Sequence, residues 1–332
     1  MQGRDRLVPG HTAKRSIDLQ SLEVFVMVCE TGNMTSAGKI LGMTQSAVSQ
    51  VIKNLEDQLG VILFDRKLRP VAITAAGTKL SLHAHQLLQD ADHMIGSVRN
   101  LGTTIIPHFR LGIVTTVAGS IGPKLVSNIY GKATELSVFS AAAPVLQKAL
   151  VRRNADIIIT TEDIDNLDTF ESHRLLQEPY LLVMSSKCAE HYGGCSLQEL
   201  AQSLPLIRYS ALTSAGKQIE RHLRRIQLDP LSSLKMDTAE AIVGMVLNDL
   251  GWTITTPLAL LRSLVHAEDL HIVPFPAPSF SRTLTLVSRR GELLALPKEI
   301  AACCQMLLRQ DVIPKLEERI SGITEKMLIG PI

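Results

Sequence analysis

Two glycines and a valine at fixed spacing, Gly38, Gly42 and Val48, most restrict how the N-terminal part of this chain can fold. The small residue at 38 lets two helices approach closely, glycine at 42 permits a tight turn, and valine at 48 anchors the second helix in the core. The spacing predicts a helix-turn-helix, with a short helix over about 35–41 and a longer one from 44–45 to 59. An aspartate at 18, followed by helically spaced apolar residues, predicts a further helix before it.

The longer helix has one apolar and one polar face. Its apolar residues, which we expect to face the core, are Ala47, Val48, Val51, Ile52 and Leu55. Its opposite face carries short polar side chains, amides and one cation: Gln45, Ser46, Ser49, Gln50 and Lys53. Side chains of this kind contact base edges and phosphates of DNA. The alternative is an ordinary solvent-exposed helix.

Two features follow this helix. Residues 61–74 hold two short apolar stretches around the basic tip Arg66-Lys67-Leu68-Arg69-Pro70, a pattern that predicts a small β-hairpin, or wing. Apolar residues then recur at alternating spacings of four and three, at Leu80, Ala84, Leu87, Ala91, Met94, Val98 and Leu101. A 3.5-residue repeat is typical of a coiled-coil seam, so residues 77–101 are expected to pair with a second copy. A long helix packed on its own domain is the alternative.

Composition narrows the class of protein. The 332 residues are enough for two or three domains. Residues 1–110 carry 12 Lys and Arg against 9 Asp and Glu, and the remainder 22 against 23, a distribution that favours nucleic acid at the N-terminal end. Residues 1–16 are expected to be a disordered leader, since they lack the apolar core of a signal peptide. No apolar run reaches the roughly 18 residues of a membrane span, and five cysteines without a CxxC pair favour a cytoplasmic location.

Beyond residue 102 the chain alternates between strand-like and helical patterns. Strands are expected near 109–114, 137–139, 156–160, 180–184, 205–207, 252–255 and 283–287, and helices near 121–130, 144–152, 214–226, 238–250, 257–264 and 297–320. This alternation predicts an α/β fold with parallel sheets and helices on both faces. The length favours two lobes, with crossovers at Glu178-Pro179 and at 273–278.

Several fragments in the right order resemble one family. They are Gln45-Ser46-Ala47-Val48-Ser49, Leu55-Glu56, Leu59-Gly60, Leu63-Phe64-x-Arg66 and Thr74-x-Ala76-Gly77. With them, residues 18–101 resemble the winged helix-turn-helix and linker helix of LysR-type transcriptional regulators. Two positions depart from the family pattern, Gly38 for alanine and Gln50 for arginine.

The resemblance implies a role for individual residues of this part. Thr35 should contact backbone phosphate, and Gln45, Ser46 and Ser49 should open the recognition helix in the major groove, with Gln50 beside them. Lys53 should meet phosphate. Arg66 and Arg69 should reach the adjacent backbone or minor groove, although Arg69 is alternatively a solvated charge of the hairpin.

The resemblance continues more loosely over 105–320. Over its whole length, the resemblance implies a winged helix-turn-helix at 17–76, a linker helix at 77–103 and an effector-binding domain at 104–322. That domain should consist of two Rossmann-like lobes resembling type 2 periplasmic binding proteins, lobe I at about 105–178 with 280–320 and lobe II at about 181–276. A small-molecule effector should lie between the lobes.

Strand ends identify candidate effector contacts. Open α/β sheets bind ligands beyond the carboxyl ends of their strands, where helix N-termini favour anions. The polar residues at such positions are Thr115, Thr116, Ser140, Thr160, Thr161, Arg208, Ser210 and Thr255. We expect them to hold a small anionic or polar metabolite; the alternative is that each caps the following helix. Alanines at 142–143 replace a polar turn of the family, which favours a more apolar ligand.

No catalytic residue, metal or cofactor is expected. Ser214-x-x-Lys217 has the spacing of penicillin-recognising enzymes but lacks their Lys-Thr-Gly element, and His83 and His85 point about 200° apart on a helix. Cys188 and Cys195 flank a glycine-rich loop, so a redox switch is an alternative to two incidental thiols.

Together these patterns predict a transcription regulator that binds promoter DNA as a dimer and responds to a metabolite. The resemblance also implies four chains on a longer site and contact with RNA polymerase. An enzyme or solute-binding protein would require a catalytic constellation or a secretion signal. A DNA-bending architectural protein would leave the large α/β part without a role.

Overall fold

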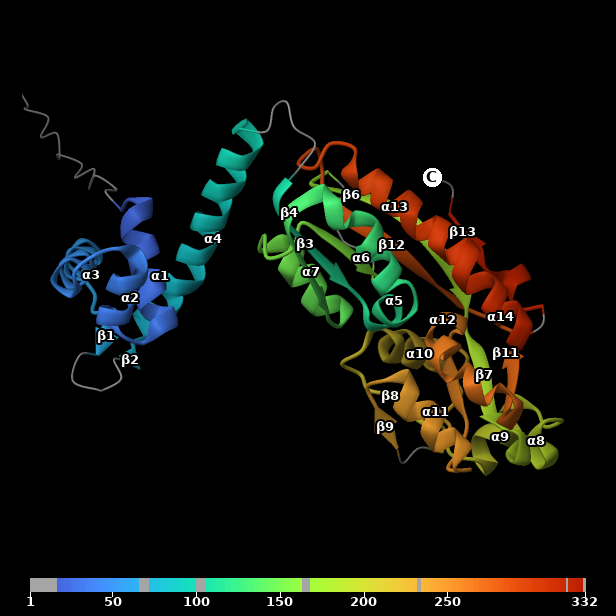
Figure 1. The fold of residues 1–332 in the computed structure, drawn as a ribbon. Helices are drawn as coiled ribbons and strands as arrows, with labels where there is room; N and C mark the ends of the chain where they lie inside the picture. Colours follow the sequence, from blue (N-terminus) through green and yellow to red (C-terminus); the bar gives the residue numbers. More distant parts are fainter. Residues whose placement is uncertain are drawn as a thin grey trace, which may run out of the picture. The chain divides into compact units, whose positions relative to one another are not determined.

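A computed structural model describes residues 17–65, 72–99, 106–162, 168–231, 234–320 and 322–330 (Figure 1). The chain forms two compact units, Met1–Leu101 and Gly102–Ile332. The expected leader at 1–16 and the tip of the wing, with Arg66 and Arg69, lie outside the described residues. Within the described part, no helix is long and apolar enough to cross a membrane.

The first unit opens with three short helices, each begun and ended by a local signal. They are α1 (Leu19–Thr31), α2 (Met34–Leu41) and α3 (Gln45–Leu59). Side chains of Asp18, Asn33 and Thr44 accept hydrogen bonds from the first free N–H groups of these helices. Each helix ends at a glycine with left-handed backbone, at 32, 42 and 60.

The helix-turn-helix prediction is confirmed in detail. Gly38 is buried, and a Cβ atom there would lie only 2.7 Å from the carbonyl oxygen of Met43. Gly42 has a φ of 65°, which closes the turn between α2 and α3. Val48 is fully buried in a core that includes Phe25 and Ile52.

A short antiparallel pair, β1 (Phe64–Asp65) and β2 (Ala72–Ile73), forms the base of the predicted wing. Thr74 fixes its return to the next helix, because its hydroxyl donates to the carbonyl of Ile62 and accepts from the N–H of Gly77. The hairpin prediction is thereby confirmed at its two strands.

The long helix α4 (Ala75–Arg99) divides the predicted seam into two parts. Leu80 and the fully buried Ala84 pack into the core of their own unit, against α1. Further along, Leu87 is 52% exposed and Met94 is 60% exposed. The first two positions of the repeat therefore serve the chain's own core, whereas the described side chains of Leu87 and Met94 are exposed.

The second unit contains a six-stranded sheet in lobe I. Its strands lie in the order β13 (Leu328–Ile329), β6 (Phe170–Pro179), β12 (Ser281–Arg289), β5 (Ile157–Thr160), β3 (Ile106–Ile113) and β4 (Ala133–Ser140). The helices of this lobe are α5 (Thr115–Ser120), α6 (Gly122–Ile129), α7 (Ala143–Val151), α13 (Leu296–Leu307) and α14 (Ile313–Arg319). Among these, α7 packs on β3 and β5, and α13 packs on β6 and β12.

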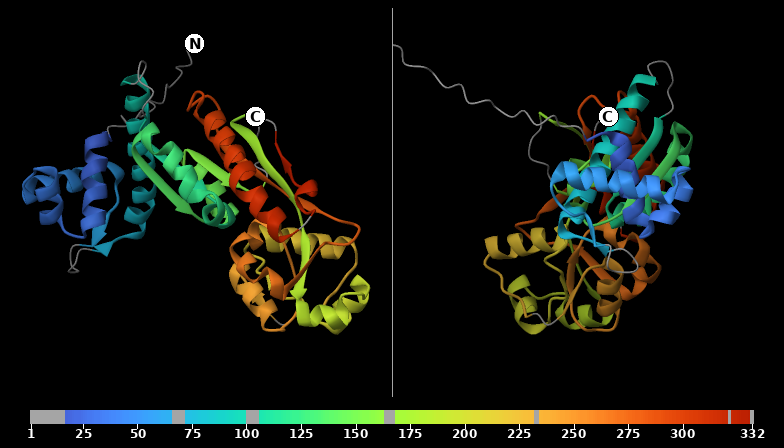
Figure 2. Two further views of the ribbon diagram at one scale, coloured as in Figure 1. Left: turned by 45° about the vertical axis from the view of Figure 1, so that its right-hand side comes forward. Right: turned by 90° about the vertical axis from the view of Figure 1, so that its left-hand side faces the viewer.

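Lobe II is built around a three-stranded sheet, β10 (Thr253–Thr255), β7 (Leu181–Ser185) and β11 (Leu270–Pro274). A parallel pair, β8 (Arg208–Tyr209) and β9 (Lys235–Met236), lies beside it. Its helices are α8 (Ser186–Tyr192), α9 (Leu197–Ser203), α10 (Ser214–Arg225), α11 (Ala239–Leu247) and α12 (Pro257–Leu260). The chain enters this lobe where β6 runs on into β7 and returns between β11 and β12 (Figure 2).

The prediction of parallel sheets is correct for only some of the strand pairs. β3 is parallel to β4 and β5, but β12 runs antiparallel to β5 and β6, and all pairs of the three-stranded sheet in lobe II are antiparallel. The cause is the double crossing: a strand that returns from lobe II must enter the lobe I sheet in the opposite direction. The helix expected over 297–320 is also divided, by a π-helical turn at Leu308–Val312 just before Pro314.

Candidate functional site

The outer face of α3 carries the polar residues that the sequence singled out. Gln45, Ser46, Gln50 and Lys53 are exposed, and Ser49 is half-buried. The Gln50 amide donates to Asn54 Oδ1 over 2.8 Å, which fixes its orientation on the surface. Lys53 forms no ion pair with a described residue, so its charge remains available to a partner.

Thr35 lies at the start of α2. Its backbone nitrogen donates to Asn33 Oδ1 over 2.8 Å, and its side chain is exposed. Together with the face of α3, it presents hydroxyl, amide and ammonium groups at the ends and face of a rigid helix pair. This surface is rich in hydrogen-bond donors, as contact with phosphate requires.

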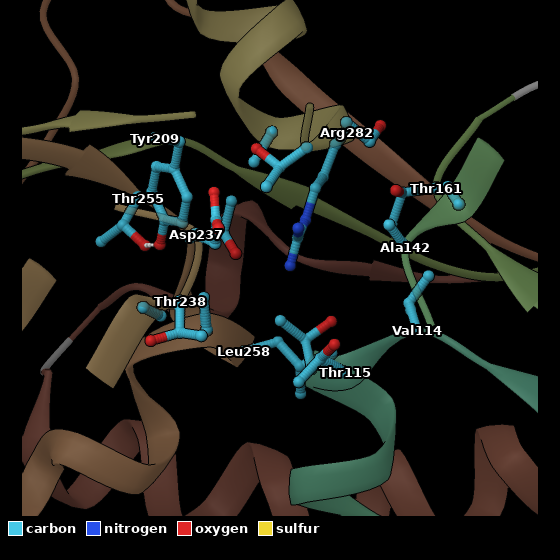
Figure 3. A pocket seen from close by; sticks show the side chains of 18 of the residues that line it. Val114, Thr115, Ala142, Thr161, Tyr209, Asp237, Thr238, Thr255, Leu258 and Arg282 are labelled. Atoms are coloured by element: carbon cyan, nitrogen blue, oxygen red, sulfur yellow. Dashed lines mark hydrogen bonds between the residues drawn. The ribbon is translucent and has the colours of Figure 1, made fainter. Parts of the chain in front are cut away.

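The second unit contains a cavity of about 350 Å³ between its lobes (Figure 3). Lobe I contributes residues after β3, β4 and β5, and lobe II contributes residues after β8, β9 and β10. Three helices of nine residues or more, α7, α10 and α11, begin at this cavity. Their positive ends create a potential that favours an anion.

Three hydroxyl groups lining the cavity have no hydrogen-bond partner among the described residues. They belong to Thr116, Ser214 and Thr256, and all three oxygen atoms are buried. Ser214 is 8% exposed and Thr256 is 1% exposed. A buried hydroxyl without a partner costs free energy, which a bound molecule with complementary groups would recover.

Two tyrosines form part of the lining. The hydroxyl of Tyr209 is hydrogen-bonded to Thr255 Oγ1 over 2.8 Å, and burial raises the pKa of Tyr209 to about 12. Tyr180 donates to Gln218 Oε1, and the Gln218 amide donates in turn to the carbonyl of Thr161 in lobe I. This chain of hydrogen bonds joins the two lobes beside the cavity.

The structure brings half of the predicted effector residues together. Thr115, Thr116, Thr161 and Thr255 line the cavity. Ser140, Thr160, Arg208 and Ser210 do not: Ser140 is exposed at the end of β4, Thr160 accepts from the N–H of Glu162, and Ser210 accepts from the N–H of Leu212.

Arg208 is placed away from the cavity by strand geometry. Successive side chains of a strand point to opposite faces, and it is Tyr209 that faces the cavity. The guanidinium of Arg208 pairs instead with Glu220 and donates to the carbonyl of Pro230. It lines a second cavity of about 440 Å³ within lobe II.

Sequence reasoning missed the buried arginine of the cavity. Arg282, at the start of β12, is 7% exposed and pairs with Glu178 of β6. Its position beside the predicted crossover at 273–278 is the signal that could have identified it, because residues next to a crossover must lie between the lobes. Tyr180 follows the other crossover in the same way.

The structure also locates the cysteines and the metal-ligating residue types of the described part. Cys188 is buried, Cys195 is exposed, and both are free thiols. Over the described residues, no group of three His, Cys, Asp or Glu side chains is arranged to hold a metal ion.

Comparison with known proteins identifies both units. Residues 19–78 match the family described as bacterial regulatory helix-turn-helix protein, lysR family, and residues 105–310 match the LysR substrate binding domain. The HTH-type transcriptional regulator BsdA of Bacillus subtilis is 25% identical over 268 residues, which cover 78% of this chain and 91% of BsdA. The nitrogen assimilation regulatory protein nac of Klebsiella aerogenes is 26% identical over 308 residues, 91% of this chain and 98% of that protein.

Solved structures share the fold. Full-length OxyR from Pseudomonas aeruginosa aligns with a TM-score of 0.63 and 18% identity, and the alignment covers 96% of this chain and 100% of OxyR. CbnR in complex with its target DNA aligns with a TM-score of 0.61 and 17% identity, covering 87% of this chain and 100% of CbnR. With the helix-turn-helix, the wing and the two-lobed unit all accounted for, this chain belongs to the LysR family of DNA-binding transcriptional regulators, with a substrate-binding domain for an effector.

Proposed function

We propose that this regulator binds promoter DNA through α3, with Gln45, Ser46 and Ser49 at base edges, Gln50 beside them, and Thr35 and Lys53 near phosphates. The observation that carries this assignment is the exposed polar face of α3, which is held rigidly by the capped α2–α3 turn. Arg66 and Arg69, outside the described residues, would extend the contact along the wing.

A dimer formed through α4 would place two recognition helices on successive half-sites. The 52% exposure of the apolar Leu87 side chain supports this pairing, since a partner helix would bury it. Two such dimers would engage a longer site, and the bound tetramer would contact RNA polymerase. The protein would act in the cytoplasm and catalyse no reaction.

The cavity of the second unit is the proposed effector site, with Thr115, Thr116, Thr161 and Thr255 among its contacts. Gln218 supports a coupling mechanism, because it bonds to Tyr180 and to the Thr161 carbonyl beside the cavity. A ligand that binds one arrangement of the lobes more tightly than another would shift their populations and hence the geometry of the DNA-binding pairs.

The test is binding of the full chain to the DNA immediately upstream of its own gene, titrated against salt. Specific binding that falls steeply with salt and is lost in Gln45→Ala/Ser49→Ala would support the assignment. Gln58→Ala, an exposed glutamine at the far end of α3, is the control and should bind as wild type. Equal binding of the double variant and the wild type would remove α3 from the interface.

A further inference from the structure

The buried ion pair between the lobes leaves one donor group directed into the cavity. Arg282 and Glu178 lie opposite each other on β12 and β6. Arg282 Nε donates to Glu178 Oε1 over 2.8 Å, and Glu178 Oε2 accepts from the N–H of Leu258. Nη2 is buried and lies 2.7 Å from Glu178 Oε1 in the ion pair, but it makes no hydrogen bond to a described residue. Nη1 makes no hydrogen bond to a described residue, and the guanidinium reaches into the centre of the cavity (Figure 3).

The charges of the lining limit what this donor can hold. Arg282 is neutralised by Glu178, and Arg262 lies 3.3 Å from Glu240. Asp237 adds a negative charge and forms no ion pair with a described residue. The attraction for an anion therefore comes from hydrogen-bond donors and from helix N-termini, and each helix N-terminus is equivalent to about half a positive charge. Such a site can stabilise one negative charge, but a second would meet Asp237 without a cation to balance it.

Polar and apolar groups divide the remaining lining. The unpartnered hydroxyls of Ser214 and Thr256 are more than nine-tenths buried, so they supply hydrogen bonds inside the cavity rather than at its rim. The rest of the lining is mostly aliphatic, with Val114, Leu212, Leu258 and the alanines at 141–143 among its members. A cavity of about 350 Å³ is at the small end of ligand sites, which limits the apolar part to about one ring.

We propose that the effector is a monocarboxylate with a small apolar body, and that Arg282 Nη1 with the hydroxyls of Ser214 and Thr256 binds its carboxylate. This inference rests on the proposed function, in which the same cavity is the effector site. The ion pair with Glu178 cancels the charge of Arg282 but leaves N–H donors of the guanidinium facing the cavity. Arg282 can therefore donate hydrogen bonds to a carboxylate without adding net positive charge to the site. Dicarboxylates and uncharged analogues are therefore discriminated against.

The experiment is calorimetric titration of the full chain with propionate, 3-methylbutanoate and benzoate, each beside its amide, and with succinate. At least one monocarboxylate should bind at least tenfold more tightly than its amide and than succinate. Arg282→Lys should weaken that binding about tenfold or more, because lysine lacks the second donor arm. Arg289→Lys, at an equally buried and ion-paired arginine outside the cavity, should bind as wild type.

A milder variant keeps the inference testable if Arg282→Lys does not fold. Thr256→Val preserves the side-chain shape and the ion pair, and should weaken monocarboxylate binding about three- to tenfold. Thr160→Val, at a buried threonine that does not line the cavity, should leave binding unchanged. Failure of all three monocarboxylates to bind, or equal binding of an amide or succinate, would overturn the inference. Promoter binding by the α3 variants is measured separately. The proposed DNA-binding function can therefore be supported even if the proposal of a monocarboxylate effector is rejected.

Discussion

The carboxylate of Glu56 lies 2.8 Å from the backbone nitrogen of Leu63, so the last turn of α3 is tied directly to the start of the wing. The same oxygen lies 3.3 Å from the nitrogen of Phe64. Glu56→Ala removes the acceptor of both N–H groups and should destabilise the first unit by about 1–3 kcal/mol. Hydrogen exchange over residues 61–65 and urea unfolding measure this loss. The exposed neighbour serves as the control: Asp57→Ala should change stability by no more than about 0.5 kcal/mol, and equal effects would contradict the explanation.

Lys53 provides a quantitative test of the DNA-facing surface. If its ammonium neutralises one phosphate, Lys53→Ala should reduce the slope of log Kobs against log salt concentration by about 0.9, because one fewer counterion is released. Filter binding or fluorescence anisotropy at several salt concentrations gives that slope. Lys298→Ala, an exposed lysine of the second unit, should leave it unchanged. An unaltered slope in Lys53→Ala would place this residue away from the DNA backbone.

His222 should make the second unit sensitive to acid. Its ring stacks on Phe280 with centroids 3.8 Å apart and is only 4% exposed. Burial and the neighbouring Arg225 lower the pKa of His222 below its usual 6.5, so the folded state holds the neutral ring. Above pH 6.5 the His222 ring is neutral in both the folded and the unfolded state, so its contribution to stability is fully present. Below it the unfolded chain gains a proton first, so stability falls as pH decreases toward the lowered folded-state pKa.

The melting temperature at pH 7.5 and pH 5.5 checks this expectation. The wild type should lose more stability over that interval than His222→Phe, which keeps an aromatic ring in the stack but cannot be protonated. His191→Gln, at an exposed histidine of the same unit, should behave as wild type. An identical pH dependence in His222→Phe and wild type would exclude His222 as the cause.

The open face of α4 predicts the effect of one charge on assembly. Leu87→Glu places a carboxylate in the proposed dimer seam and should convert the dimer to monomer at micromolar concentration, as measured by sedimentation equilibrium. Leu82 has the same exposure of 52% but lies on the opposite side of the helix. Leu82→Glu should therefore remain dimeric. Dissociation by Leu82→Glu but not by Leu87→Glu would move the interface to the other face.

The parts of the fold that follow from local signals could be predicted from the sequence. The spacing of Gly38, Gly42 and Val48 indicated both helices and the turn, because each residue has a local steric role. The antiparallel insertion of β12 could not be predicted, since strand direction depends on where the chain crosses between lobes. At the site, the rule of strand ends found Thr116 and Thr255. It selected Arg208 instead of Tyr209 because a shift of one residue reverses the face of a strand.

The position of β12 in the lobe I sheet has a consequence for synthesis on the ribosome. β12 separates β5 from β6, so these earlier strands cannot be joined in one sheet until residue 289 has emerged. The strands of the lobe II sheet, by contrast, all lie within 181–274 and are available sooner. Between these moments the nascent chain exposes the edges of β5 and β6, which pair with nothing else in lobe I on that side. Slow translation past residue 274 would therefore prolong an aggregation-prone intermediate and make a holdase chaperone most valuable there.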